Sequence, residues 1–151
     1  MANRKTHEWM GMAAGGGAAL FRARREPFAD RLVEAVGGAI GGYFGGKMPD
    51  ILEPAIHGWH RDLCHSWTIG GLVAKGVTTL GRWETECRER AADFRRRRLT
   101  TGAPPSTVFF YWLAEMFWNL AAGFVAGFGA GYLSHLVLDA STPRGLPVLC
   151  R

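Results

Sequence analysis

The chain has 151 residues, the length of one domain, so a single domain over residues 1–151 is expected. Apolar residues make up 48% of it, which is enough to bury a core and excludes a disordered chain. Its three cysteines (Cys64, Cys87 and Cys150) lack C-x-x-C spacing and cannot form a closed disulfide framework, which excludes a zinc ribbon and a disulfide-stapled secreted scaffold. The net charge of +5 fits nucleic acid, anionic lipid or an uneven surface equally well.

Four stretches with few charges follow one another along the chain. Residues 9–21 and 35–46 carry no charge, 66–81 carries only Lys75, and 106–133 carries only Glu115. Proline and glycine separate these stretches, and no segment alternates apolar and polar residues long enough for a strand. We therefore expect an all-α fold, a four-helix up-down bundle with helices near 7–24, 28–47, 65–92 and 106–141.

Glycine recurs at four-residue spacing in two of the predicted helices. The repeats are Gly37, Gly41 and Gly45, the shifted set Gly38, Gly42 and Gly46, and the later set Gly123, Gly127 and Gly131. Each glycine costs about 1 kcal/mol in a water-exposed helix, whereas in a bilayer small residues at this spacing let helix backbones approach closely. The spacing favours a membrane-embedded or membrane-associated protein, with membrane lipids as partners and the glycine-rich helices available for a homo-oligomer.

Only 106–133 reaches the length of about 20 apolar residues that a membrane span needs. Close packing in a soluble bundle is therefore the alternative. We expect Glu115 and Asn119 to be buried in this helix, with Arg82 as the partner of Glu115.

Arginine is concentrated in two clusters, at 22–31 and at 82–98, the second ending in four consecutive arginines. Acidic residues dilute the second cluster and no DNA-binding motif accompanies it, so nucleic acid is not expected as a partner. Because basic loops remain cytoplasmic, these clusters predict an inner-membrane protein whose opposite end faces away from the cytoplasm. We expect no signal peptide, since residues 13–19 are mostly glycine and alanine.

Ligand-type residues fall at the opposite helix ends in the up-down arrangement. The set is His7, Asp50, His60, His65, His135 and Asp139. His135 and Asp139 share one helix face at i, i+4, whereas His60 and His65 meet only if His60 lies in the preceding loop. Taken singly, each has an ordinary structural explanation, such as a hydrogen-bonded His–Asp pair. Their convergence from four segments predicts one or two divalent ions, zinc first, with manganese or iron as alternatives.

Four segments also resemble the YdjM-like family, described as LexA-regulated, membrane-bound metal-dependent hydrolases. The matching pieces are Met-Pro-Asp-Ile at 48–51, His-Arg-Asp-Leu-Cys-His-Ser at 60–66, Gly-Tyr-Leu-Ser-His-Leu-Val-Leu-Asp at 131–139 and Thr-Pro-Arg-Gly-Leu-Pro-Val-Leu at 142–149. His7 also fits. The family pattern P-D-x-D has a second aspartate where this chain has Leu52, followed by Glu53.

The resemblance implies a membrane-associated metal-dependent hydrolase, with a phosphoester or lipid-linked compound as the substrate class. In that reading Asp62 or Glu53 acts as a base, and Arg61 neutralises charge on a phosphoryl group. The alternative from another class is a small, non-catalytic membrane interaction or packing protein, in which the glycine repeats and basic clusters are the whole function. A soluble helical metal-binding bundle is a third hypothesis.

Overall fold

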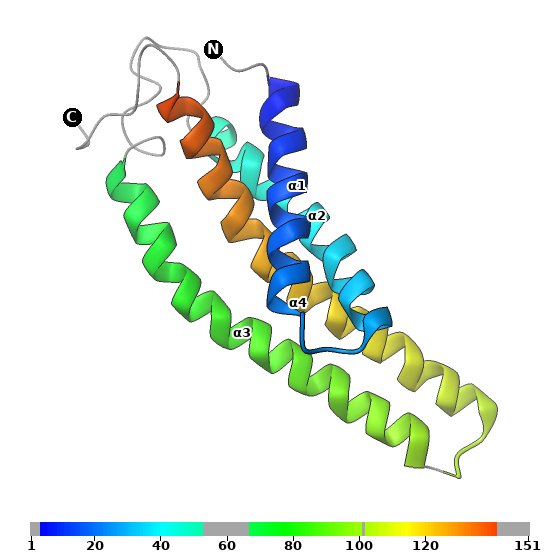
Figure 1. Ribbon diagram of the computed structural model, residues 1–151. Helices are drawn as coiled ribbons and strands as arrows, with labels where there is room; N and C mark the ends of the chain where they lie inside the picture. Colours follow the sequence, from blue (N-terminus) through cyan, green and yellow to red (C-terminus); the bar gives the residue numbers. More distant parts are fainter. Residues whose placement is uncertain (1–3, 53–66, 101, 142–151) are drawn as a thin grey trace.

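The computed structural model describes residues 4–52, 67–100 and 102–141. They form four helices: α1 (Arg4–Arg22), α2 (Phe28–Leu52), α3 (Trp67–Thr100) and α4 (Pro105–Ala140) (Figure 1). These ranges contain no strand, so the predicted all-α class is confirmed for the described part of the chain.

Three of the helices extend further than their sequence patterns predict. α1 begins at Arg4, so the first helical turn holds His7. α2 continues to Leu52 with Pro49 inside it, and Asp50 therefore lies in its last turn rather than in a loop. α3 continues through the second arginine cluster, which is thus helical surface and not a connection. Arginine, glutamate and alanine are good helix formers, and pairs such as Asp93–Arg97 at 2.7 Å add i, i+4 support.

The helices alternate in direction along the chain, so that α2 and α4 run parallel (Figure 1). These two helices pack against each other, and α1 packs against both of them. Within the described ranges, the backbone of α3 approaches that of α4 only. The arrangement therefore consists of three mutually packed helices, with α3 placed along one of them.

Glycine makes the contact between α2 and α4 possible. The carbonyls of Glu34, Gly38 and Gly42 face Gly123, Gly127 and Gly131 respectively, so the register advances by four residues on both helices. A Cβ atom at Gly127 would lie 2.6 Å from the Cα of Gly38, which is far too close for two carbon atoms. Ridges of residues four apart on both helices, lined by small side chains, give this close crossing.

α1 continues the same packing on another side of α2. A Cβ atom at Gly15 would lie 2.7 Å from the Cα of Gly42, and the stripe of α1 then continues as the fully buried Ala19, with Ala23, also fully buried, just after the end of the helix. The third set, Gly37, Gly41 and Gly45, faces backbone carbonyls of α4, so all three sets of glycine repeats are occupied by contacts within the chain. A homo-oligomer would have to use another surface.

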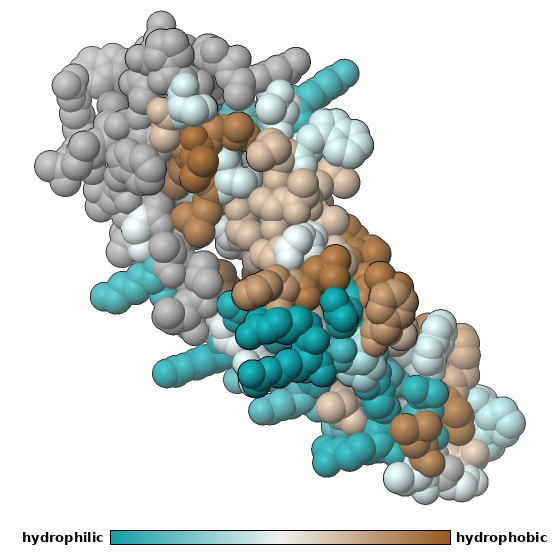
Figure 2. Space-filling model, viewed as in Figure 1, coloured by the Kyte–Doolittle hydropathy of each residue, from teal (hydrophilic) through white to brown (hydrophobic). Residues whose placement is uncertain are grey.

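The interior is small and polar, whereas the outward faces of α1, α2 and α4 are apolar. Among the described residues, the buried apolar side chains are Ala19, Ala23, Cys87, Ala91, Ala122, Tyr132 and Leu136. Large apolar side chains point outward, for example Trp9 (69% exposed), Phe28 (70%) and Phe110 (65%). In Figure 2, hydrophilic residues gather where α3 and the α1–α2 turn lie, with apolar residues beside them.

One described helix, α4, is long and apolar enough to cross a membrane. The buried core helix of a soluble protein would have the same length and composition. The outward apolar faces of α1 and α2 reverse the usual distribution in a soluble protein, where large apolar side chains are mostly inside.

Candidate metal centre

The candidate site lies where the glycine stripes of three helices end. On α4, the four-residue step from Gly127 to Gly131 continues to His135 and Asp139. On α1, His7 precedes Gly11 by the same step, and on α2, Asp50 follows Gly46 by it. Because these stripes are the contact faces of the helices, the residues that continue them converge at one end.

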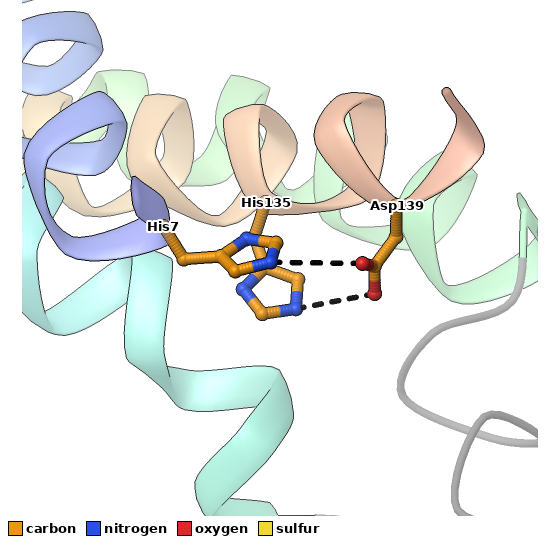
Figure 3. A group of neighbouring side chains, drawn as sticks. All are labelled: His7, His135 and Asp139. Carbon is orange, nitrogen blue, oxygen red and sulfur yellow. Dashed lines mark ion pairs between the residues drawn. The ribbon is translucent and has the colours of Figure 1, made fainter. Parts of the chain in front are cut away.

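Two imidazoles and one carboxylate meet there (Figure 3). Nε2 of His7 lies 3.6 Å from Oδ1 of Asp139, and Nε2 of His135 lies 3.5 Å from Oδ2 of the same carboxylate. The two imidazole rings stack with their centroids 3.9 Å apart. All three side chains are buried, His135 completely. The carboxylate of Asp139 therefore faces both imidazoles, one at each oxygen.

A backbone carbonyl orients His135. Its Nδ1 lies 2.6 Å from the carbonyl oxygen of Gly46, which can only accept a hydrogen bond, so Nδ1 carries the proton. In the neutral imidazole the lone pair is then on Nε2, which faces Asp139. A proton or a metal ion between these two acceptors would bridge them. Proteins also orient metal-binding histidines in this way: a hydrogen bond from the ring nitrogen that does not bind the metal fixes the tautomer.

Gly46 also contacts the other histidine. A Cβ atom at this position would lie 2.9 Å from the carbonyl oxygen of His7. One glycine of α2 therefore touches the backbone at His7 and accepts the hydrogen bond of His135. Only a residue without a side chain lets both helices come this close.

The separations suit a small divalent ion. One ligand atom from each of His7, His135 and Asp139 can be chosen so that all lie within 4.8 Å of one another. Ligand atoms at about 2.0–2.1 Å from a tetrahedral zinc are about 3.4 Å apart, close to the two His–Asp distances. Two histidines and one carboxylate leave a fourth position open, as in catalytic zinc sites. This group could therefore hold a metal ion.

Asp50 lies beside the group. Its Oδ1 is 3.7 Å from Nε2 of His135, and 46% of its side chain is exposed. Next to Gly46, Lys47 is 3.3 Å from a carboxylate oxygen of Glu8 and donates a hydrogen bond to Tyr43. The hydrogen bond to Tyr43, followed by Glu8, raises the pKa of Lys47 above its ordinary value, so it stays protonated. A paired cation and an exposed carboxylate thus flank the buried group.

The structure brings together four of the six predicted ligands, namely His7, Asp50, His135 and Asp139. The remaining predicted residues, His60, His65, Arg61, Asp62 and Glu53, lie outside the described residues. The Gly46 carbonyl was not predicted. The sequence does contain a pattern that indicates it: when the glycine repeats of α2 and α4 are aligned, the four-residue spacing places Gly46 opposite His135.

At the other end of α4, Glu115 and Asn119 are buried as predicted, but the predicted partner of Glu115 is wrong. The carboxylate accepts hydrogen bonds from Arg95 and Arg98, both at 2.9 Å, and Arg82 is exposed. The reason is the length of α3. Because it continues to Thr100 before the chain turns into α4, Arg95 and Arg98 come opposite Glu115.

Comparison with protein-family models, curated proteins and solved structures finds no match. The fold and the site define an all-helical protein with a buried His–His–Asp group. Membership of the YdjM-like family stays a prediction from the sequence.

Proposed function

We propose that the chain is a membrane-associated, metal-dependent hydrolase whose ion is held by His7, His135 and Asp139. The observation that carries the proposal is the buried cluster in which two imidazoles face one carboxylate at 3.5–3.6 Å. Zinc is the preferred ion, with manganese or iron as alternatives, because the donors are nitrogen and oxygen without a thiolate. A second ion would need Asp50 together with residues outside the described ranges.

A divalent ion at this position would supply Lewis acidity and an activated water molecule for hydrolysis. The residues of the chain orient the site. The Gly46 carbonyl fixes the tautomer of His135, and Asp139 holds both imidazoles in place. Asp50 places a partly exposed carboxylate beside the buried group, so it is suited to accept a proton at Oδ1 or to complete the ligand set.

The membrane part of the proposal rests on α4 and on the outward apolar side chains of α1, α2 and α4. The arginine clusters lie at the end away from the metal site, and basic segments favour the cytoplasmic side. We therefore propose that the site faces the non-cytoplasmic side of an inner membrane. A phosphoester or lipid-linked substrate follows from the family resemblance.

Zinc titration of purified, metal-free protein tests the site. We expect about one tightly bound equivalent for the wild type and an affinity at least about tenfold weaker for Asp139→Asn. Asp93→Asn is the matched control, because Asp93 is a helical aspartate on α3 that pairs only with neighbouring arginines. Less than about 0.2 equivalents bound by the wild type at neutral pH would refute the metal site.

Hydrolysis of a chromogenic phosphodiester, bis(4-nitrophenyl) phosphate, tests the activity. The zinc-loaded wild type should cleave it, and a variant with both His135→Ala and Asp139→Asn should not. Tight zinc binding without cleavage of this or of phospholipid diesters would support the non-catalytic membrane packing protein instead.

A further inference from the structure

Four buried carboxylates lie away from the metal site and take no part in the proposed function. They are Asp30, Glu34, Glu84 and Glu115, each at most 4% exposed. Each meets at least one arginine, so we define these four acids and their arginines, Arg22, Arg88, Arg95 and Arg98, as the ionic seam. Burying this many charges is costly unless each is paired, and their pairing gives the seam a defined geometry.

The seam consists of two neutral chains of ion pairs. In the first, Glu84 is 2.6 Å from Arg22 and 2.7 Å from Arg88, and Arg88 is 2.6 Å from Glu34. In the second, Arg95 pairs with Asp30 and, at 2.9 Å, with Glu115, whose other oxygen is 2.9 Å from Arg98. Each chain contains two positive and two negative groups, so the seam has no net charge to attract a ligand.

Among the side chains that the structure describes, ion pairs link α3 to α1 and α2. Arg22 comes from α1, and Asp30 and Glu34 come from α2, whereas the described α3 backbone approaches only α4. Between residues 79 and 100, the buried apolar side chains of α3 are Cys87 and Ala91. This part of α3 packs along α4, with Phe94 near Tyr111 and Arg90 over the ring of Trp118, but it meets α1 and α2 through charge, in contrast to the glycine contacts that join α1, α2 and α4.

The two kinds of contact differ in how they respond to perturbation. Close backbone packing stabilises through dispersion and is insensitive to salt. A buried ion pair gains in Coulomb energy about what it loses in desolvation, so its net contribution is small although its geometry is specific. The arginine side chains of the seam are 19–41% exposed, so solvent anions can reach them.

We propose that residues 79–100 of α3 form a strap that opens from α1 and α2, turning about its contact with α4, when the ionic seam is broken. The body keeps its glycine contacts in the open state, because none of them involves α3. Opening exposes the carboxylates of the seam and the face of α3 that carries Cys87.

Cys87 provides a native reporter of this opening. It is buried on α3 between Glu84 and Arg88, and burial raises the pKa of its thiol. Both effects slow its reaction with thiol reagents while α3 is closed, since the thiolate is the reactive form. Replacing Cys64 and Cys150 by serine in the full chain leaves Cys87 as the single reactive thiol.

The experiment measures the rate at which Cys87 reacts with a water-soluble thiol reagent in the detergent-solubilised chain. Arg88→Met should raise the rate at least about tenfold, and Arg22→Met, which removes one outer pair, should raise it less. Arg96→Met is the control, because Arg96 is exposed and pairs only with Asp93. Raising NaCl from about 0.05 M to about 1 M should accelerate labelling of the wild type.

Hydrogen exchange of the same variants separates opening from unfolding. In Arg88→Met, peptides from residues 79–100 should lose protection while peptides from residues 37–46 keep it. Equal labelling rates in Arg88→Met, Arg22→Met and the wild type would overturn the proposal, because the seam would then not hold α3. Loss of protection in both regions would also overturn it, because α3 would not move as a separate unit.

Discussion

Gly131→Ala should weaken metal binding without touching a ligand. A Cβ atom at this position would lie 2.6 Å from the Cα of Gly42, whereas non-bonded carbons prefer at least about 3.5 Å. The two helices must therefore separate by about 1 Å near this point. His135 is one turn further along α4, and its Nδ1 is 2.6 Å from the carbonyl of Gly46 on α2. A shift of about 1 Å takes that hydrogen bond beyond its normal range.

Losing the hydrogen bond that orients a metal-binding histidine typically costs about 10–100-fold in affinity, and we expect a zinc affinity weaker by that factor. Overpacking costs about 1–3 kcal/mol, and the better helix propensity of alanine returns about 1 kcal/mol. The net change in unfolding free energy is therefore a loss of about 0–2 kcal/mol. The assays are competition with a chromophoric chelator and denaturant unfolding of the metal-free protein.

Two controls separate the site from general packing. Gly127→Ala creates the same kind of clash, against Gly38, but this clash lies two turns from His135. The variant should therefore lose about as much unfolding free energy as Gly131→Ala but bind zinc more tightly. Gly17→Ala has open space around its new side chain and should stabilise by up to about 1 kcal/mol. Zinc affinity of Gly131→Ala within about twofold of the wild type would show that the contact between α2 and α4 does not orient the site.

Three further outcomes are expected. The metal-bound fold requires neutral imidazoles, so it binds fewer protons than the unfolded chain. Zinc occupancy and melting temperature should therefore both fall as pH drops through about 6.5. Values of both that stay constant from about pH 5 to 8 would contradict this. Glu115→Gln leaves two half-buried arginines without their shared carboxylate and should cost about 1–3 kcal/mol in denaturant unfolding, whereas the exposed Glu86→Gln should change stability by less than about 0.5 kcal/mol. In intact cells, an impermeant thiol reagent should label a single cysteine replacing Leu52 and spare one replacing Arg97, and the opposite pattern would invert the proposed topology.

The helical class was predictable because its signals are local. Charge-poor stretches separated by proline and glycine mark helices through properties of neighbouring residues, and each described helix overlaps a predicted one, with its ends shifted by up to eight residues. The glycine spacing also predicted close helix contacts. A repeat of four residues places small side chains on one helix face, whichever helix packs there.

The sequence-based prediction was wrong where the ion-pair partner of a side chain depends on the residue at which a helix ends. The arginine-rich segment was expected to leave the helix near residue 92, which put Arg82 at the depth of Glu115. In the structure α3 continues to Thr100, so Arg95 and Arg98 take that place. Helix ends depend on small differences in propensity and pairing, and a shift of a few residues changes which side chains meet.

The sequence alone determined that His135 and Asp139 share a helix face, because a spacing of four residues is a local property of any α-helix. It also placed His7 and Asp50 at the same end, since the order of the helices dictates their direction. Only the tertiary structure decided that His7 stacks on His135, and that the Gly46 carbonyl accepts the hydrogen bond that Nδ1 of His135 donates. These contacts depend on the register between α1, α2 and α4, which is set by the backbone approach at their glycines and by no property of one helix by itself.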